Sequence, residues 1–290
     1  MFMARYTLVY AAYGFEHTFQ LNMLWFSILV LSVVFISAAG YIINDYFDVQ
    51  TDEINKPDKI YIGRTIKRRK AMVVHQVINI IGLLLGLACA INVGRPLLFL
   101  YHFIAAGALW FYSAQLKRKL AIGNIVVSLL IGLVVWLGIA YEIKGVNDKM
   151  GWAIAANLLS YGAIYSTFAF TINLMREIVK DAEDFEGDQL ISSNTIPIRF
   201  GLKNTIKVLM ALALFTAFLI FGYCQILLQM LNINNPILYW LLNLIALFPF
   251  IYLFLKLKKA DTKADFSSIS SLLKVIMLFG IFSMLCFLWM

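Results

Sequence analysis

Two short acidic stretches of this sequence contain residues whose types and spacing could bind a ligand or take part in catalysis. The first reads "NDYFDVQTD" over residues 44–52, and the second reads "KDAEDFEGD" over residues 180–188. When the stretches are laid over each other, three aspartates coincide: Asp45, Asp48 and Asp52 match Asp181, Asp184 and Asp188. Like charges four residues apart on a helix repel each other. A pattern of this kind that occurs twice predicts a bound cation.

Residues four positions apart share one face of a helix, which makes each stretch a ladder of polar side chains. The ladders are Asn44, Asp48 and Asp52 in the first stretch and Lys180, Asp184 and Asp188 in the second. Asp45 and Asp181 flank these faces. Carboxylate oxygens suit a hard divalent ion, and Mg²⁺ keeps waters and shares its coordination with substrate phosphates. We therefore expect Mg²⁺ as the cofactor.

Basic residues near the acidic stretches suggest that the Mg²⁺ site holds a diphosphate. Lys59 and Arg64 follow the first stretch, and "YSAQLKRK" over residues 112–119 contributes Tyr112, Lys117 and Arg118. The basic run at residues 67–70 is interpreted differently, as an anchor that contacts anionic lipid at the membrane surface.

The elements that position these residues must be membrane helices. With 62% hydrophobic and 14% charged residues, the chain has too little polar surface to cover a water-soluble globule. Apolar runs near the roughly 20 residues needed to cross a bilayer predict an all-α, polytopic transmembrane bundle of eight to nine helices, as one domain over residues 1–290. The expected spans are 22–43, 71–91, 96–115, 121–141, 152–173, 205–228, 235–256 and 269–289. Residues 6–14 are apolar but too short to span, so they form an incomplete first crossing or enter the membrane partway.

The basic residues predict the orientation of the bundle. Most of the 24 Lys and Arg lie in the connections expected on one side, which are residues 44–70, 116–120, 174–204 and 257–268. The positive-inside rule places these connections, both acidic stretches and the N-terminus on the cytoplasmic side of the cell membrane. The net charge of +8 is then a topology signal, with the lipid bilayer as a partner and neither nucleic acid nor a protein partner implied. Because each acidic stretch follows a span toward this side, the chain is also expected to consist of two four-helix halves.

These motifs resemble those of the UbiA family of intramembrane prenyltransferases. That family carries a first motif NDxxDxxxD and a second motif DxxxD, each after a transmembrane helix in a bundle of nine. Here "NDYFDVQTD" fits the first and "DFEGD" fits the second, and supporting matches extend from "AAGYIINDYFD" through "YS…LKRK…GN" to "REIVKDAEDFEGD…TIPIRFG". The segment "REIVKDAEDFEGD" is most similar to the branch that contains digeranylgeranylglyceryl-phosphate synthase and chlorophyll synthase.

The resemblance implies how the residues would act. Catalysis would depend on the motif residues that hold Mg²⁺ on the diphosphate of an isoprenoid donor, which are Asn44, Asp48, Asp52, Asp184 and Asp188, joined by Asp45 and Asp181 in the metal site. Diphosphate contacts are expected from Asn44, Lys59, Arg64, Tyr112, Lys117, Arg118 and Lys180. Ionisation of the donor would leave an allylic carbocation, which a lipophilic acceptor captures.

The acceptor class stays open at this point. We expect geranylgeranyl diphosphate as donor and a geranylgeranylglycerol-phosphate-like ether lipid as acceptor. The alternative is prenylation of an aromatic quinone precursor of the dihydroxynaphthoate, hydroxybenzoate or homogentisate type. An ion-coupled secondary transporter also carries acidic residues in its bundle, but near mid-membrane on broken helices rather than at cytoplasmic ends.

Overall fold

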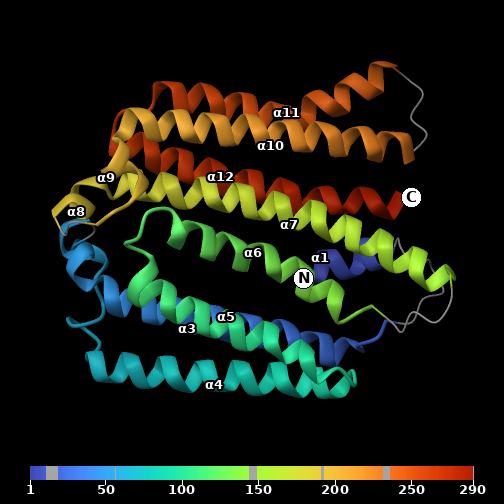
Figure 1. Ribbon diagram of the computed structural model, residues 1–290, viewed down its shortest axis with the longest axis horizontal. Coiled ribbons are helices and arrows are strands. Elements are labelled where there is room, and N and C mark those ends of the chain that lie inside the picture. The colour runs from blue at the N-terminus through green and yellow to red at the C-terminus, as the bar shows by residue number, and fades with distance from the viewer. Residues whose placement is uncertain (11–18, 56, 144–148, 191–192, 231–235, 290) are drawn as a thin grey trace.

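The fold is a bundle of long helices that lie side by side (Figure 1). The computed structural model describes residues 1–10, 19–55, 57–143, 149–190, 193–230 and 236–289, and no strand occurs within these ranges. Eight segments are long and apolar enough to cross a membrane. They are α3 (Met23–Asn55), α4 (Arg68–Asn92), α5 (Phe99–Phe111) with the flanking η3 (Pro96–Leu98) and η4 (Tyr112–Leu116), α6 (Ile122–Ala140), α7 (Lys149–Glu183), α10 (Leu202–Met230), α11 (Pro236–Lys259) and α12 (Lys263–Ser283). The predicted all-α membrane bundle is confirmed.

The helices form two packed groups. In the first, α3, α4 and α5 pack on one another and α5 contacts α6, while in the second α7 packs against α10 and α12, and α11 against α10 and α12. The core of the second group includes Ile172 of α7, Leu209 of α10, Leu253 of α11 and Leu273 of α12, all buried. The extensive contact between α6 and α7 joins the groups. The expected division into two four-helix halves stays a prediction, because α6 contacts α7 far more extensively than it contacts α5.

Helices α3 and α7 are longer than their expected spans. They contain 33 and 35 residues, whereas a bilayer needs roughly 20. Residues 44–55 and 174–183, which were expected in connections, are therefore the last turns of these helices. The drop in hydropathy marks where each helix leaves the apolar core and not where the helix ends. Helix α3 is described as far as Asn55, two residues before Pro57.

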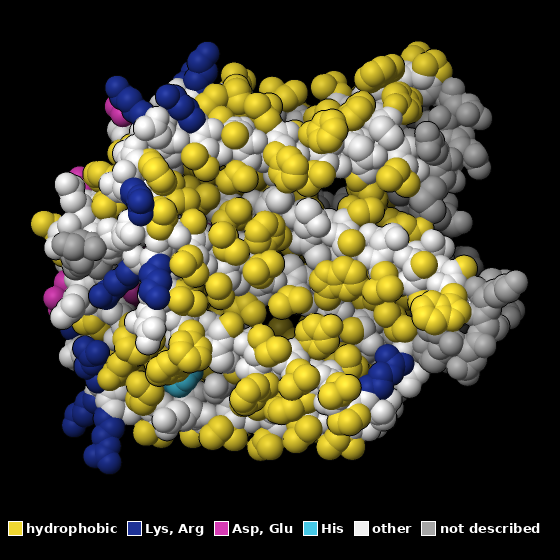
Figure 2. Space-filling view, viewed as in Figure 1, with side chains coloured by type: hydrophobic (Ala, Val, Ile, Leu, Met, Phe, Trp, Pro, Cys, Tyr) yellow, Lys and Arg dark blue, Asp and Glu magenta, His cyan; other side chains and the backbone are white. Residues whose placement is uncertain are grey.

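One end of the bundle is basic. We call it the basic end; it consists of residues 57–70, 116–121, 176–190, 193–204 and 256–263. Figure 2 shows Lys and Arg side chains gathered mainly at this end, and hydrophobic side chains along the middle of the molecule. Short elements cover the basic end: η2 (Pro57–Lys59), α8 (Phe185–Leu190) and α9 (Ile196–Phe200).

The N-terminal segment packs in the half of the bundle opposite the basic end. Short helices α1 (Phe2–Ala4) and η1 (Arg5–Val9) contact α6, α7 and the C-terminal η5 (Met284–Trp289). Leu8 and Val9 are fully buried there. This part of the expected segment 6–14 does not cross the bundle, and residues 11–14 lie outside the described residues.

Candidate functional site

The first acidic stretch forms the last turns of α3 at the basic end. Helix α8 packs against α3, so the second acidic stretch lies beside the first (Figure 1). On α3, the amide Nδ2 of Asn44 donates to the Oδ2 of Asp48 at 2.7 Å, which confirms that the two share a face as the ladder predicted. Asp48 is buried, with 6% of its surface exposed.

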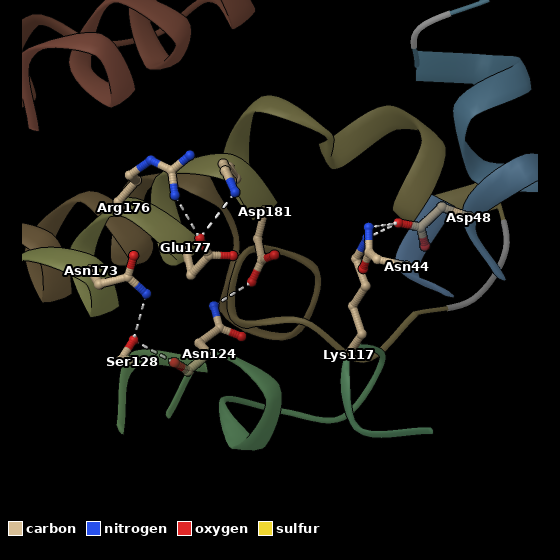
Figure 3. Close-up of polar contacts among 10 residues, drawn as sticks. Asn44, Asp48, Lys117, Asn124, Ser128, Asn173, Arg176, Glu177 and Asp181 are labelled. Atoms are coloured by element: carbon tan, nitrogen blue, oxygen red, sulfur yellow. Dashed lines mark hydrogen bonds and ion pairs between the residues drawn. The ribbon is translucent and has the colours of Figure 1, made fainter. Parts of the chain in front are cut away.

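Lys117 forms an ion pair with Asp48 from the connection between η4 and α6 (Figure 3). Burial alone lowers the pKa of a lysine, but the nearby carboxylates, Asp48 first and Asp52 next, raise the pKa of Lys117 overall. The ammonium therefore stays charged. The turn that presents it depends on Gly123, because a Cβ there would lie 2.9 Å from the Cα of Lys117 and from the carbonyl oxygen of Leu116.

The second acidic stretch runs from α7 into α8 with the helical hydrogen-bond pattern preserved. The amide of Asp184 donates to the carbonyl of Lys180 at 2.9 Å, and the amide of Asp188 donates to the carbonyl of Asp184 at 3.0 Å. Burial, and then the charge of Asp184, raises the pKa of the Asp188 carboxyl to about 6. A cation bound beside Asp188 would offset both effects.

Three polar residues inside the apolar spans connect α6 to Asp181. Asn124 of α6 donates from Nδ2 to Oδ2 of Asp181 at 2.7 Å, and the carbonyl of Asn124 accepts from Ser128 Oγ at 2.6 Å. Asn173 of α7 in turn donates to Ser128 Oγ at 3.2 Å (Figure 3). No role for these residues was predicted from the sequence. The available signal was their polarity within membrane spans, where uncompensated polar groups are costly.

A charged cluster on α7 also escaped the sequence analysis. Glu177 is buried and accepts at Oε1 from both Arg176 Nη1 and Lys180 Nζ, at 3.0 Å each. Lys180 was expected to contact the donor diphosphate, and the structure pairs it with Glu177. Tyr112 is partly buried and lies within range of the charges of Glu177, Asp181 and Asp48.

The other residues that were predicted to contact the diphosphate or the metal lie farther from the Lys117–Asp48 pair or make other contacts. Arg64 is exposed and donates to the carbonyl of Pro57 at 2.8 Å, within its own loop. Arg118 is exposed, and its carbonyl accepts from the amide of Asn194 at 3.0 Å. Lys59 ends η2, but its side chain lies outside the described part of the structure. Asp45 and Asp52 both lie in the last turns of α3, where Asp52 follows Asp48 in the ladder and Asp45 flanks it.

The donor set fits Mg²⁺ that is completed by a substrate. Among the described residues, no three His, Cys, Asp or Glu side chains are close enough to hold a metal by themselves. Mg²⁺ commonly binds through one or two carboxylates and takes its other ligands from water and substrate phosphates. Asp48 on α3 and Asp188 on α8 supply such carboxylates, and burial together with the charge of Asp184 raises the pKa of Asp188.

Comparison with known proteins identifies the family. The family model of the UbiA prenyltransferase family matches residues 3–279. A digeranylgeranylglyceryl phosphate synthase of Methanosphaera stadtmanae is 28% identical over 92% of this chain and 88% of its own. A solved structure of digeranylgeranylglyceryl phosphate synthase is similar with a TM-score of 0.65 and 26% identity, over 98% of this chain and 89% of that chain. A UbiA homolog from Archaeoglobus fulgidus bound to GPP and Mg²⁺ shares the fold, with a TM-score of 0.60 and 16% identity over 97% and 95% of the chains. The chain belongs to the UbiA prenyltransferase family and is an integral membrane prenyltransferase.

Proposed function

We propose that this enzyme transfers an isoprenoid chain from a prenyl diphosphate to a hydroxyl of a glycerol-phosphate ether lipid. Geranylgeranyl diphosphate is the expected donor and a geranylgeranylglycerol phosphate the expected acceptor. The observation that carries the proposal is the pairing of Lys117 with Asp48 beside the carboxylates of α8. It supplies carboxylate ligands for a metal and an ammonium for a diphosphate in one place. The similarity to digeranylgeranylglyceryl phosphate synthases supports this acceptor class.

The donor diphosphate would lie between α3 and α8. Its metal would be held by motif residues, which are Asn44, Asp48, Asp52, Asp184 and Asp188, with Asp45 and Asp181 adjoining. Bound there, Mg²⁺ would stabilise the negative charge that develops on the departing diphosphate. Lys117 and Tyr112 would donate hydrogen bonds to other phosphate oxygens. Arg64 and Arg118, which are exposed, would assist from the rim, and Lys59 stays a predicted diphosphate contact.

The reaction exchanges one C–O bond for another. The allylic C–O bond of the donor breaks with both electrons passing to the diphosphate. The acceptor hydroxyl oxygen then bonds to the allylic carbon, and its proton passes to the departing diphosphate. The surrounding helices exclude bulk water, so that the allylic carbon reacts with the acceptor and not with water.

The basic end is proposed to face the cytoplasm of the cell membrane. The concentration of Lys and Arg at this end supports that orientation (Figure 2). A soluble prenyl diphosphate would then reach Asp48 and Asp188 from the aqueous side, while the lipid acceptor approaches through the bilayer.

A transfer assay tests the proposal. Membranes that contain the protein are incubated with radiolabelled geranylgeranyl diphosphate, Mg²⁺ or EDTA, and either glycerol-phosphate ethers or aromatic quinone precursors. We expect a labelled ether lipid in Mg²⁺ that is lost in EDTA. Product only from the aromatic acceptors would overturn the acceptor assignment, and no product from any acceptor with intact protein would overturn the donor assignment as well.

A further inference from the structure

The charged cluster on α7, which consists of Arg176, Glu177 and Lys180, is separate from the Lys117–Asp48 pair. In Figure 3, Asp181 and Asn124 lie between Arg176 and Glu177 on one side and Lys117 and Asp48 on the other. The cluster contains two cations and one carboxylate, so it carries a net charge of +1. The reaction proposed above also has two separate anionic groups, the donor diphosphate and the acceptor phosphate.

The cluster is arranged to receive an anion. Arg176 and Lys180 are four residues apart on α7, where like charges repel each other, and the single carboxylate of Glu177 neutralises only one of them. The side chains of Arg176 and Lys180 are 21% and 38% exposed, whereas that of Glu177 is 10% exposed. The carboxylate is therefore more deeply buried than the two cations, whose side chains each remain partly exposed.

The guanidinium of Arg176 keeps one edge available. Its Nη1 donates to Glu177, while its Nε is buried and has no hydrogen-bond partner within the described residues. The edge formed by Nε and Nη2 can donate two parallel hydrogen bonds, which is how arginine binds phosphate or carboxylate. A carboxylate would use both of its oxygens on that edge. A phosphate has a third oxygen, which Lys180 can reach as a point charge.

We infer that Arg176 and Lys180 bind the phosphate group of the acceptor, with Glu177 holding both cations in position. The inference rests on the proposed function and specifies its acceptor subsite. Lys180 lies one helical turn before Asp184, about 6 Å along the axis. A phosphate bound at the cluster therefore lies close to the metal-binding carboxylates, as required when a glycerol joins the phosphate to the reacting hydroxyl. Lys180 thus serves the acceptor and not the donor diphosphate expected from sequence.

Steady-state kinetics with two acceptors tests the inference. The enzyme is assayed as wild type, Arg176→Gln, Lys180→Gln and the control Lys203→Gln, which removes an exposed charge from the basic end. The acceptors are geranylgeranylglycerol phosphate and the same molecule without its phosphate. Binding of the donor is measured in the same preparations, and it reports both folding and an intact donor site.

We expect Arg176→Gln and Lys180→Gln each to raise KM for the phosphorylated acceptor about tenfold to a hundredfold, as for the loss of a charge-assisted hydrogen bond. Donor binding, the rate with the phosphate-free acceptor and the control should stay at wild-type values. An unchanged KM for the phosphorylated acceptor overturns the inference, as does weakened donor binding, which would place the cations in the donor site. Failure of the wild type to use either glycerol acceptor would instead overturn the proposed function.

Discussion

Lys117 and Asp48 form an ion pair that joins the turn before α6 to the last turns of α3. The pair combines one of the expected metal ligands with one of the expected diphosphate contacts. Since a carboxylate can exchange an ammonium for a metal, a Mg²⁺-diphosphate complex would find both of its partners already in place. We therefore propose that the donor phosphates lie beside this pair.

Removal of the Lys117 charge should weaken donor use. We expect Lys117→Gln to lower kcat/KM for the prenyl diphosphate about tenfold to a hundredfold, because a hydrogen bond to a charged group contributes about 1.5–3 kcal/mol. The control is Lys119→Gln, since Lys119 is an exposed neighbour in the same turn. Equal donor kinetics in Lys117→Gln and Lys119→Gln would contradict this role for Lys117.

The titration of Asp188 should make metal binding depend on pH. Burial and the charge of Asp184 raise the pKa of Asp188 to about 6, well above the usual value for aspartate. A metal binds only the ionised carboxylate, so below this pH protons compete with Mg²⁺, and above it they do not. We expect the Mg²⁺ concentration for half-maximal activity to rise as the pH falls from 7.5 to 5.5. In Asp188→Asn, any residual activity should lose this dependence, and a wild-type requirement that stays constant over this range contradicts the assignment.

The hydrogen bond from Asn124 to Asp181 should stabilise both the helix pair and the site. We expect Asn124→Ala to lower the free energy of unfolding by about 1–3 kcal/mol, because the carboxylate of Asp181 loses a donor within the bundle. Mg²⁺ affinity should fall as well. Ser160→Ala serves as the control, since Ser160 is an exposed residue of α7 whose hydroxyl donates to the carbonyl of Ala156 in the same helix. Thermal unfolding and Mg²⁺ titration of both variants measure the difference, and identical results for the two would contradict this role for Asn124.

A buried ion pair at the opposite end of the bundle should affect stability without affecting the chemistry. Arg5 and Glu142 lie 3.2 Å apart, with side chains 2% and 0% exposed, and they connect the N-terminal segment to the end of α6. We expect Glu142→Gln to lower the free energy of unfolding by about 3–5 kcal/mol, because it leaves the charge of Arg5 buried and uncompensated.

The double variant Arg5→Met/Glu142→Met should recover much of that loss, since apolar residues can replace a buried ion pair with little cost. Thermal unfolding in detergent tests both variants, and donor affinity of the folded fraction should match the wild type in each. A single variant as stable as the wild type would show that the pair does not stabilise the fold.

The sequence predicted the parts of the site that depend on local pattern. The spacing of Asn44 and Asp48 placed them on one face of a helix, and the hydrogen bond between them confirms it. The apolar runs located the membrane spans, because length and hydropathy alone identify a transmembrane helix. The membrane span was predicted to end at residue 43, whereas α3 continues to Asn55, since hydropathy reports the edge of the bilayer and not the end of the helix.

Contacts between segments far apart in the chain could not be predicted from the sequence pattern. Nothing local to Asn124 shows that it donates to Asp181, and nothing local to Arg5 shows that it pairs with Glu142, because each contact depends on how helices far apart in the chain pack. Arg176 and Glu177 were visible as part of a motif, but their arrangement around one carboxylate oxygen required the fold. Lys117 was predicted as one of several cations, and only the structure separates it from Arg64 and Arg118.

Binding of a non-reactive donor tests the central claim that both acidic stretches hold one diphosphate. Radiolabelled geranylgeranyl thiolodiphosphate would be titrated against the wild type, Asp48→Asn, Asp188→Asn and the double variant, each with Mg²⁺ and with EDTA. We predict Mg²⁺-dependent binding that either single substitution abolishes, with no further loss in the double variant, because both carboxylates act on the same complex. Wild-type binding by folded Asp48→Asn or Asp188→Asn would contradict the claim and show that the two stretches do not form one site.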